Sequence, residues 1–249
     1  MKGLRYIKGW TFLIILTSFM LFQSNLPVYK DRAHWEKTGK IIWEVPTEEK
    51  VIALTFDDGP SPTFTPQILD ILNRFDAKAT FFVIGEQAEK FPDIVKQEAF
   101  EGHSIGNHMY THKQVSKMSL NELINNLRRA DQLILSLTGK SPHFFRPPDG
   151  YYDETIVKAA ESLDYHVVIW TWGKDTKDWS NKLASSIAQQ IIKDIKNGDI
   201  ILFHDQGGDR SNTVESLKIL LPILKEDGYN FVTIDELMKH FSTNDTKDI

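Results

Sequence analysis

Short apolar segments alternate along this chain with longer amphipathic segments, and this alternation constrains the fold more than any other feature. Helical patterns separate the apolar segments, so consecutive strands have room to cross over and run parallel. The sequence predicts an α/β fold with a parallel sheet closed, or nearly closed, into a barrel, one unit short of the common eightfold barrel. The predicted strands are 51–56, 79–84, 103–106, 143–146, 165–170, 199–203 and 230–234.

Two helices carry clear start signals. Ser119 and Glu122 have the spacing of a capping box, an apolar stripe runs on to Leu137, and Gly139 follows as a stop. A second helix is predicted to begin with Thr65 as its N-cap and Pro66 at the first helical position.

Composition narrows the class of protein. A chain of 249 residues can bury a sizeable core within one domain. Its net charge of −5, without a long basic run, argues against a nucleic-acid partner. The chain has no Cys, so a bound metal must be held by His, Asp or Glu.

The N-terminus has the layout of an export segment. Lys2, Arg5 and Lys8 precede the apolar stretch 10–22, which is short for a membrane-spanning helix. Both a cleaved signal and a retained membrane anchor fit residues 1–29, and either takes the protein to the cell envelope or outside the cell. We expect a spacer that docks on the domain at 30–49, a catalytic domain at 50–241 and a polar tail at 242–249.

Polar residues gather where the predicted strands end. Because the C-terminal ends of barrel strands meet at one face, residues from five strand ends are expected to converge there. They are Asp57 and Asp58 after the first strand, His108 and His112 after the third, Arg146 at the fourth, Asp175 and Asp178 after the fifth, and His204 at the sixth.

The histidine pair suggests a metal site. His108 and His112 are four residues apart, which places both rings on one side of a helical turn. Two His and one Asp leave coordination positions open for water and substrate, as in catalytic zinc sites. Of the adjacent Asp57 and Asp58, one can bind the cation while the other accepts a proton. His103 is interpreted as a histidine bonded to the backbone rather than as an additional ligand.

Five segments in a fixed order resemble the motifs of the polysaccharide deacetylases, carbohydrate esterase family 4. They are TFDDGP (55–60), HMYTH (108–112), RPPDG (146–150), DTKDW (175–179) and LFHD (202–205), and the resemblance covers residues 50 to about 235. It implies a single distorted (β/α) barrel of about seven parallel strands with the active site at their C-terminal ends. It also implies metal-dependent removal of acetyl groups from glycans.

The resemblance assigns roles residue by residue. Asp57 becomes the general base and His204 the general acid, with Arg146 holding Asp57 and Asp178 orienting His204. The expected cofactor is one divalent metal ion, Zn²⁺ first, with Co²⁺ or Ni²⁺ able to replace it. The implied metal ligands are Asp58, His108 and His112, and Trp179 and Leu202 are expected to wall the acetyl pocket.

Two positions depart from the family pattern. Met109 stands where the family usually has Ser or Thr, and Asp149 stands where it usually has Tyr. The residue at 149 is expected to offer its backbone N–H to the oxyanion, which any residue except Pro can do. Five aromatic residues near the motifs are candidates for stacking on sugar rings, although Trp170 also fits the core. They are Tyr110, Tyr151, Tyr152, Trp170 and Trp172.

The sequence therefore predicts an exported or membrane-tethered, monomeric deacetylase that acts on a glycan polymer, with cell-wall peptidoglycan as the leading substrate. An O-acetyl esterase of xylan and a deacetylase of chitin-like oligomers use the same chemistry. A glycan-binding pseudoenzyme is a rival of another class, motivated by Met109 and Asp149. A structural envelope protein is disfavoured, because it needs no acids and imidazoles at five strand ends.

Overall fold

The computed structural model describes residues 31–240, so the predicted export segment 1–29 and the tail 242–249 lie outside the described residues. Within 31–240, no helix combines the length and the apolar character needed to cross a membrane. The strands are β1 (Ile41–Ile42), β2 (Val51–Asp57), β3 (Ala79–Val83), β4 (Ser104–Asn107), β5 (Phe144–Phe145), β6 (His166–Val168), β7 (Ile200–His204) and β8 (Asn230–Phe231).

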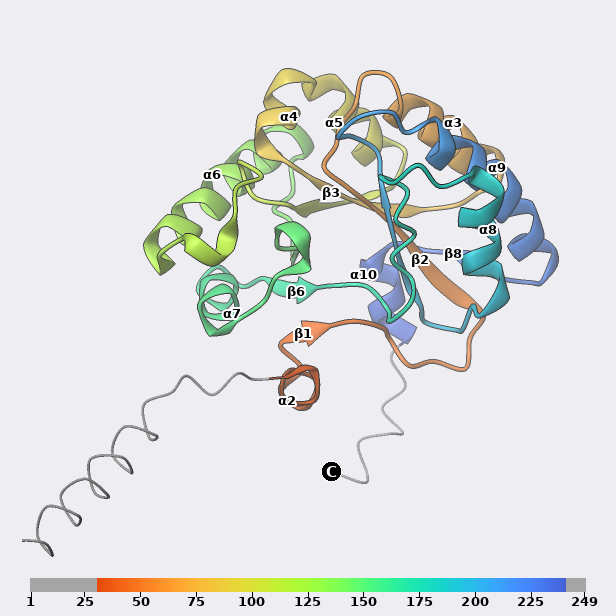
Figure 1. The fold of residues 1–249 in the computed structure, drawn as a ribbon. Helices are drawn as coiled ribbons and strands as arrows, with labels where there is room; N and C mark the ends of the chain where they lie inside the picture. Colours follow the sequence, from red (N-terminus) through yellow and green to blue (C-terminus); the bar gives the residue numbers. More distant parts are fainter. Residues whose placement is uncertain (1–30, 241–249) are drawn as a thin grey trace, which may run out of the picture.

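Helices surround the sheet on its outer side (Figure 1). The α-helices are α2 (Arg32–Thr38), α3 (Thr65–Arg74), α4 (Gly85–Lys90), α5 (Pro92–Phe100), α6 (Leu120–Thr138), α7 (Glu154–Glu161), α8 (Ala184–Lys193), α9 (Ser211–Glu226) and α10 (Ile234–Leu237). Short 3-10 turns are η1 (Val115–Lys117), η2 (Pro148–Gly150) and η3 (Met238–His240).

Seven strands form one parallel sheet in the order β1-β6-β5-β4-β3-β2-β7, and β8 pairs with the start of β2. Between the outer strands β1 and β7, the flanking residues Glu44 and Asp199 form an isolated bridge, and the Val45 N–H donates to the Gly198 carbonyl. The predicted fold is confirmed as an α/β fold whose seven parallel strands curl into a distorted half-barrel.

Each of the seven predicted segments contains a strand, but strand β1 was not predicted. Residues 30–49 were expected to be a spacer, and their described part forms α2 and β1. Strand β1 pairs in parallel with β6 through Ile41 with Val167 and Ile42 with Val168. Trp35 and Trp43 from the same segment lie in the buried cluster under α6 and α7. This segment therefore forms one edge of the sheet.

The helix signals were right for α6 and wrong in one detail for α3. Ser119 caps α6 in a full capping box with Glu122, and Gly139 ends the helix with φ 74°. Thr65 was predicted to cap α3, but the N-cap is Phe64 and Thr65 is the first helical residue. Its hydroxyl is used elsewhere: it accepts the Ser61 N–H and donates to Asp205.

The register of the sheet sets the positions of the polar strand ends. Asp57 and His204 are Cα partners in the ladder between β2 and β7, and Asn107 and Phe145 are partners between β4 and β5. The strand interiors are apolar on both sides, as expected for a parallel sheet covered by helices. The polar groups at the C-terminal ends therefore lie above a rigid apolar base.

Candidate metal centre and active site

A cavity of about 440 Å³ opens at the C-terminal ends of the strands. Eight of the residues predicted from the motifs line it together, namely Asp57, Asp58, His108, His112, Asp149, Trp179, Leu202 and His204. Gly150, Trp170, Asp175 and Arg210 complete the lining. The convergence expected from the strand ends is therefore present in the structure.

Asp58, His108 and His112 form a candidate metal site. One ligand atom from each lies within 4.8 Å of the others. The Nε2 atoms of both histidines are 3.5 Å from Asp58 Oδ1, a buried oxygen without a hydrogen-bond partner among the described residues. These distances and this orphaned oxygen fit a shared cation, because three N and O donors converge on one point with open positions beside them.

The surroundings of His108 prepare it as a ligand. Its Nδ1 lies 2.6 Å from the Arg146 carbonyl oxygen, which accepts a hydrogen bond from that nitrogen and leaves Nε2 facing Asp58. Metal-bound histidines commonly make such a bond from the second ring nitrogen. Burial raises the pKa of Asp58, but the close contact with His108 and the charges of His108, His204 and His112 outweigh burial and lower that pKa.

Asparagines hold the turn between the two histidines. The Asn107 Oδ1 accepts the Met109 N–H at 2.8 Å, and the Asn126 Oδ1 from α6 accepts the N–H groups of Tyr110 and Thr111. Met109 has φ 69° and its side chain is fully buried in the core. Sequence reasoning missed both asparagines. Asn126 lies on α6, which meets this turn only in the tertiary structure, whereas the bond of Asn107 to a residue two positions on is a local signal that could have been found.

A buried arginine holds the second aspartate. Arg146 is fully buried and its NH1 donates to Asp57 Oδ1 at 2.8 Å and to Thr55 Oγ1 at 2.7 Å. Its other nitrogens donate to the carbonyls of Val168 and Ile169. All three guanidinium nitrogens are thus used, and they fix the Asp57 carboxylate at the edge of the cavity.

His204, which lines the same cavity, makes a second pair with Asp178. The His204 Nδ1 is 2.8 Å from Asp178 Oδ1, and the His204 backbone N–H donates to Asp178 Oδ2, which also accepts from Thr213. Burial lowers the pKa of His204, but Asp178, with smaller contributions from Asp57 and Asp58, outweighs burial and raises that pKa to about 9. His204 is therefore protonated at neutral pH in the absence of metal.

The remaining predicted residues differ in position. Leu202 is buried and Trp179 is exposed at the cavity wall, while Asp149 is exposed on η2 with φ 58°. Tyr110 lies away from the cavity: its ring is buried beside Gly85, its hydroxyl donates to Glu89, and the Arg129 guanidinium lies 3.4 Å above the ring. Its side chain therefore packs among α4 and α6 and is not brought to the site.

Arg210 was not predicted. It is buried in the cavity lining, and its guanidinium donates to the carbonyls of Gln206, Gly207 and Asp209 in the loop after β7. Its position in the chain, outside the five motifs, offered no signal.

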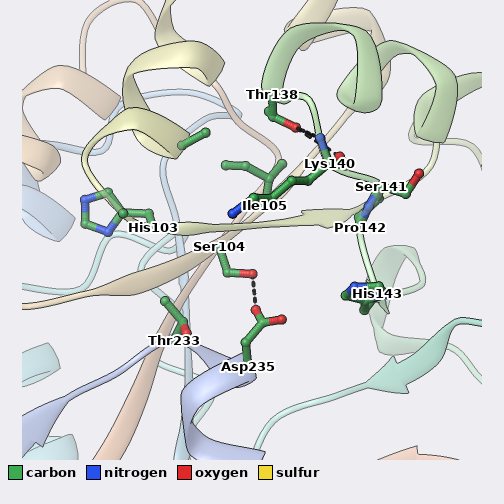
Figure 2. Close-up of a pocket in the computed structure, with 12 residues that line it drawn as sticks. His103, Ser104, Ile105, Thr138, Lys140, Ser141, Pro142, His143, Thr233 and Asp235 are labelled. Carbon is green, nitrogen blue, oxygen red and sulfur yellow. Dashed lines mark hydrogen bonds between the residues drawn. The ribbon is translucent and has the colours of Figure 1, made fainter.

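A larger hollow of about 610 Å³ lies at the opposite ends of the strands (Figure 2). Ser104 points toward Asp235 there and donates a hydrogen bond to it. His103 is buried, and its Nδ1 accepts the Ala79 N–H at 3.1 Å, which confirms its interpretation as a histidine bonded to the backbone. Burial, aided by the charge of Lys78, lowers the pKa of His103 to about 4. Among the described residues, the groups lining this hollow do not form a cluster that could hold a metal ion, as Asp58, His108 and His112 do.

Known proteins resemble this chain in sequence and in fold. The profile of the polysaccharide deacetylase family matches residues 44–168. A peptidoglycan-N-acetylglucosamine deacetylase of Bacillus cereus is 46% identical over 209 residues, which is 84% of this chain and 98% of that protein.

Two solved structures are similar along most of the chain. A peptidoglycan N-acetylglucosamine deacetylase in complex with a substituted N-hydroxybenzamide has a TM-score of 0.79 at 38% identity, covering 82% of this chain and 95% of that one. A family 4 acetyl xylan esterase from Clostridium thermocellum, in complex with a cobalt ion, has a TM-score of 0.71 at 34% identity, covering 76% and 91%. The profile match and the level of identity establish that this chain belongs to the polysaccharide deacetylase family.

Proposed function

We propose that this protein hydrolyses the acetamide of N-acetylglucosamine residues in peptidoglycan, giving a free amine and acetate. The observation that carries the proposal is the arrangement of the cavity: a three-residue metal site shares it with a held carboxylate, Asp57, and with an imidazole, His204, whose Nδ1 is paired with Asp178. The 46% identity to a Bacillus cereus enzyme of that name supports the choice of substrate.

The proposed cofactor is one divalent cation, Zn²⁺ in the native protein, held by Asp58, His108 and His112. When bound, such a cation polarises the acetyl carbonyl and lowers the pKa of a neighbouring water. Imidazole and carboxylate donors also accept Co²⁺ and Ni²⁺. We expect simultaneous replacement of both histidines by Ala to abolish stoichiometric Zn²⁺ binding, measured by elemental analysis, while replacement by Ala of His166, an exposed residue at the start of β6, keeps it.

Asp57 is the proposed proton acceptor. Its carboxylate is buried at the cavity edge, and Arg146 holds one oxygen at 2.8 Å. The attacking water transfers a proton to this carboxylate as its oxygen bonds to the acetyl carbon. The guanidinium keeps the carboxylate oriented before the reaction.

His204 is the proposed proton donor. An amine is a poor leaving group, so the C–N bond breaks readily only when the nitrogen receives a proton. The Nδ1 of His204 is occupied by Asp178, which leaves Nε2 to deliver that proton. Trp179 and Leu202 are proposed to enclose the acetyl methyl group, and the Asp149 N–H is proposed to stabilise the developing oxyanion.

Acetate release from a panel of polymers tests the substrate. Residues 30–249 should release acetate from N-acetylated peptidoglycan, with added Zn²⁺ and not with chelator, and at a higher rate than from acetylxylan or chitooligosaccharides. A preference for acetylxylan would favour O-acetyl esterase activity, which the likeness to an acetyl xylan esterase structure makes worth measuring. Release from none of the three, with metal bound, would favour a glycan-binding pseudoenzyme.

The cell envelope is the proposed place of action. Residues 1–29 have the basic and apolar layout of an export signal or membrane anchor, and peptidoglycan lies outside the cytoplasmic membrane. Fusion of 1–29 to a reporter enzyme, followed by cell fractionation, should place the reporter outside the cytoplasm, and the position of the mature N-terminus distinguishes cleavage from anchoring. We further propose that the protein acts as a monomer.

A further inference from the structure

Asp205 is a buried carboxyl group that the proposed reaction does not use. It follows His204 directly, its side chain is fully buried, and its Oδ1 has no hydrogen-bond partner among the described residues. A buried polar group without a full set of partners costs stability, so its presence calls for a reason.

Asp205 contacts the turn that carries metal ligand Asp58. Its backbone N–H donates to the Asp57 carbonyl at 3.2 Å. Its carboxylate lies against Gly59 so closely that a Cβ on Gly59 would be 2.2 to 2.6 Å from the carboxylate atoms. The side chain of Asp205 therefore occupies the space that a side chain at residue 59 would need.

A hydroxyl extends this contact to the far end of the turn. Thr65, the first residue of α3, donates from Oγ1 to Asp205 Oδ2. The Thr65 Oγ1 also accepts the Ser61 N–H at 2.7 Å. Asp205 and Thr65 thus hold the segment 57–61 from one side. On the other side, the Ile84 N–H donates to the Gly59 carbonyl at 3.0 Å.

The turn needs such support because its backbone is strained at the ligand itself. Asp58 has φ 76°, in the left-handed region that a non-glycine residue adopts only at a cost in free energy. Without the contacts of Asp205 and Thr65, this turn is expected to relax, and the Asp58 carboxylate is then expected to move away from His108 and His112.

We infer that Asp205 is a positioning residue for the metal site: its carboxyl group and the Thr65 hydroxyl hold the 57–61 turn so that Asp58 faces the two histidines. The inference rests on the proposed metal site and assigns a role to two residues outside the ligand set. The role depends on the shape of the Asp205 side chain, because its carboxyl group fills the space beside Gly59 and accepts a hydrogen bond from the Thr65 hydroxyl.

The test measures Zn²⁺ dissociation constants by calorimetry on metal-free protein, with folding checked by circular dichroism. Asp205→Ala and Thr65→Val should each raise the Kd about tenfold or more, in the range seen when groups supporting metal ligands are removed. Asp205→Asn keeps the planar group and an acceptor for Thr65, so its Kd should stay within about threefold of wild type. Thr65→Val keeps the test decisive if Asp205→Ala fails to fold.

Thr80→Val is the matched control, because Thr80 is a fully buried threonine whose hydroxyl accepts the Ile234 N–H and makes no hydrogen bond to segment 57–61 among the described residues. It should lower thermal stability and leave the Kd unchanged. Unchanged Kd values in both Asp205→Ala and Thr65→Val would overturn the inference and leave the metal site intact. An equal rise of the Kd in Asp205→Asn and Asp205→Ala would also overturn the inference and leave the metal site intact. Wild-type protein that binds no Zn²⁺ would overturn the metal site and the inference together.

Discussion

Asp57 and Asp58 are neighbours in the chain but have different surroundings. Arg146 holds the Asp57 carboxylate by a hydrogen bond, whereas Asp58 faces His108 and His112. Two adjacent carboxylates repel each other, and here a guanidinium stabilises one while a cation would stabilise the other. The separate surroundings predict separate functions.

Asp57→Asn should lose about 10²-fold or more in turnover while it binds Zn²⁺ with nearly wild-type affinity, because an amide cannot accept the proton of the attacking water. Asp58→Asn should bind Zn²⁺ more weakly, because the ligand loses its charge. Calorimetry and an acetate-release assay on both variants check this division. If both variants lose metal equally, the two roles are assigned incorrectly.

His204 and Asp178 make a pH-dependent pair. The pKa of His204 is raised to about 9 in the folded protein, above its ordinary value of 6.5. A raised pKa means that the pair stabilises the fold fully below pH 6.5 and that this contribution is lost as the pH rises through about 9. The dependence therefore runs toward lower stability in alkaline solution.

Asp178→Asn should lower the pKa of His204, because the carboxylate that favours the imidazolium is gone. An NMR titration of the metal-free protein should show the His204 ring titrating well below pH 9 in this variant. Urea denaturation should show a larger loss of stability at pH 6 than at pH 10. An equal loss at both pH values would mean that the pair stabilises the fold without the charge.

At the scale of elements, the long periodic segments were predictable, whereas strand β1 was not. The α6 capping box and its stop at Gly139 depend on neighbours in sequence, so local patterns determine them. Strand β1 is as short as β5 and β8, but charged residues interrupt the apolar ones in its segment, and its partner β6 is distant in sequence. Thr65 was misread for a similar reason, since Asp205, its partner, is distant in sequence.

The candidate site divides in the same way. The residues proposed as metal ligands and proton-transfer groups could be located because each lies at a strand end within a motif. Asn126 and Arg210 could not, because they reach the site through the packing of α6 and the loop after β7. Tyr110 belongs to a motif, yet the pairing of its hydroxyl with Glu89 directs it away from the cavity.

Trp43→Ala should destabilise the fold by about 3 to 5 kcal/mol, the usual cost of truncating a buried Trp. Trp43 is 5% exposed, packs edge-on against Tyr152, and belongs to the segment that forms β1. Trp172→Ala is the control, because its side chain is 87% exposed. Equal urea midpoints for the two variants would show that the N-terminal segment adds little to the domain.

At the scale of the whole molecule, the core and the metal site are separate. Three hydrophobic clusters fill the sheet and its helices, and the triad sits above them at the cavity. Removal of metal should therefore leave the fold intact, unlike the unfolding seen in small zinc domains. Far-UV circular dichroism should be unchanged by chelator.

The melting temperature should still depend on Zn²⁺ concentration. A ligand that binds only the folded state stabilises it by about 2.7 kcal/mol at a hundred times its Kd. Thermal melts across a Zn²⁺ series measure this, and Asp58→Asn should flatten the dependence. A chain that unfolds when chelator is added at room temperature would contradict the separation of core and site.

The pairing of Asp57 with His204 in the ladder has a consequence for how this enzyme can change. Main-chain hydrogen bonds between two neighbouring strands fix the spacing of Asp57 and His204, the proposed proton acceptor and donor, and a slip of one residue would shift one strand end against the other by about 3.3 Å. Side chains in the core can then vary in size, and the outer loops in length, without altering that spacing. New glycan preferences and greater heat resistance are thus accessible by substitution at positions that leave the reaction geometry untouched.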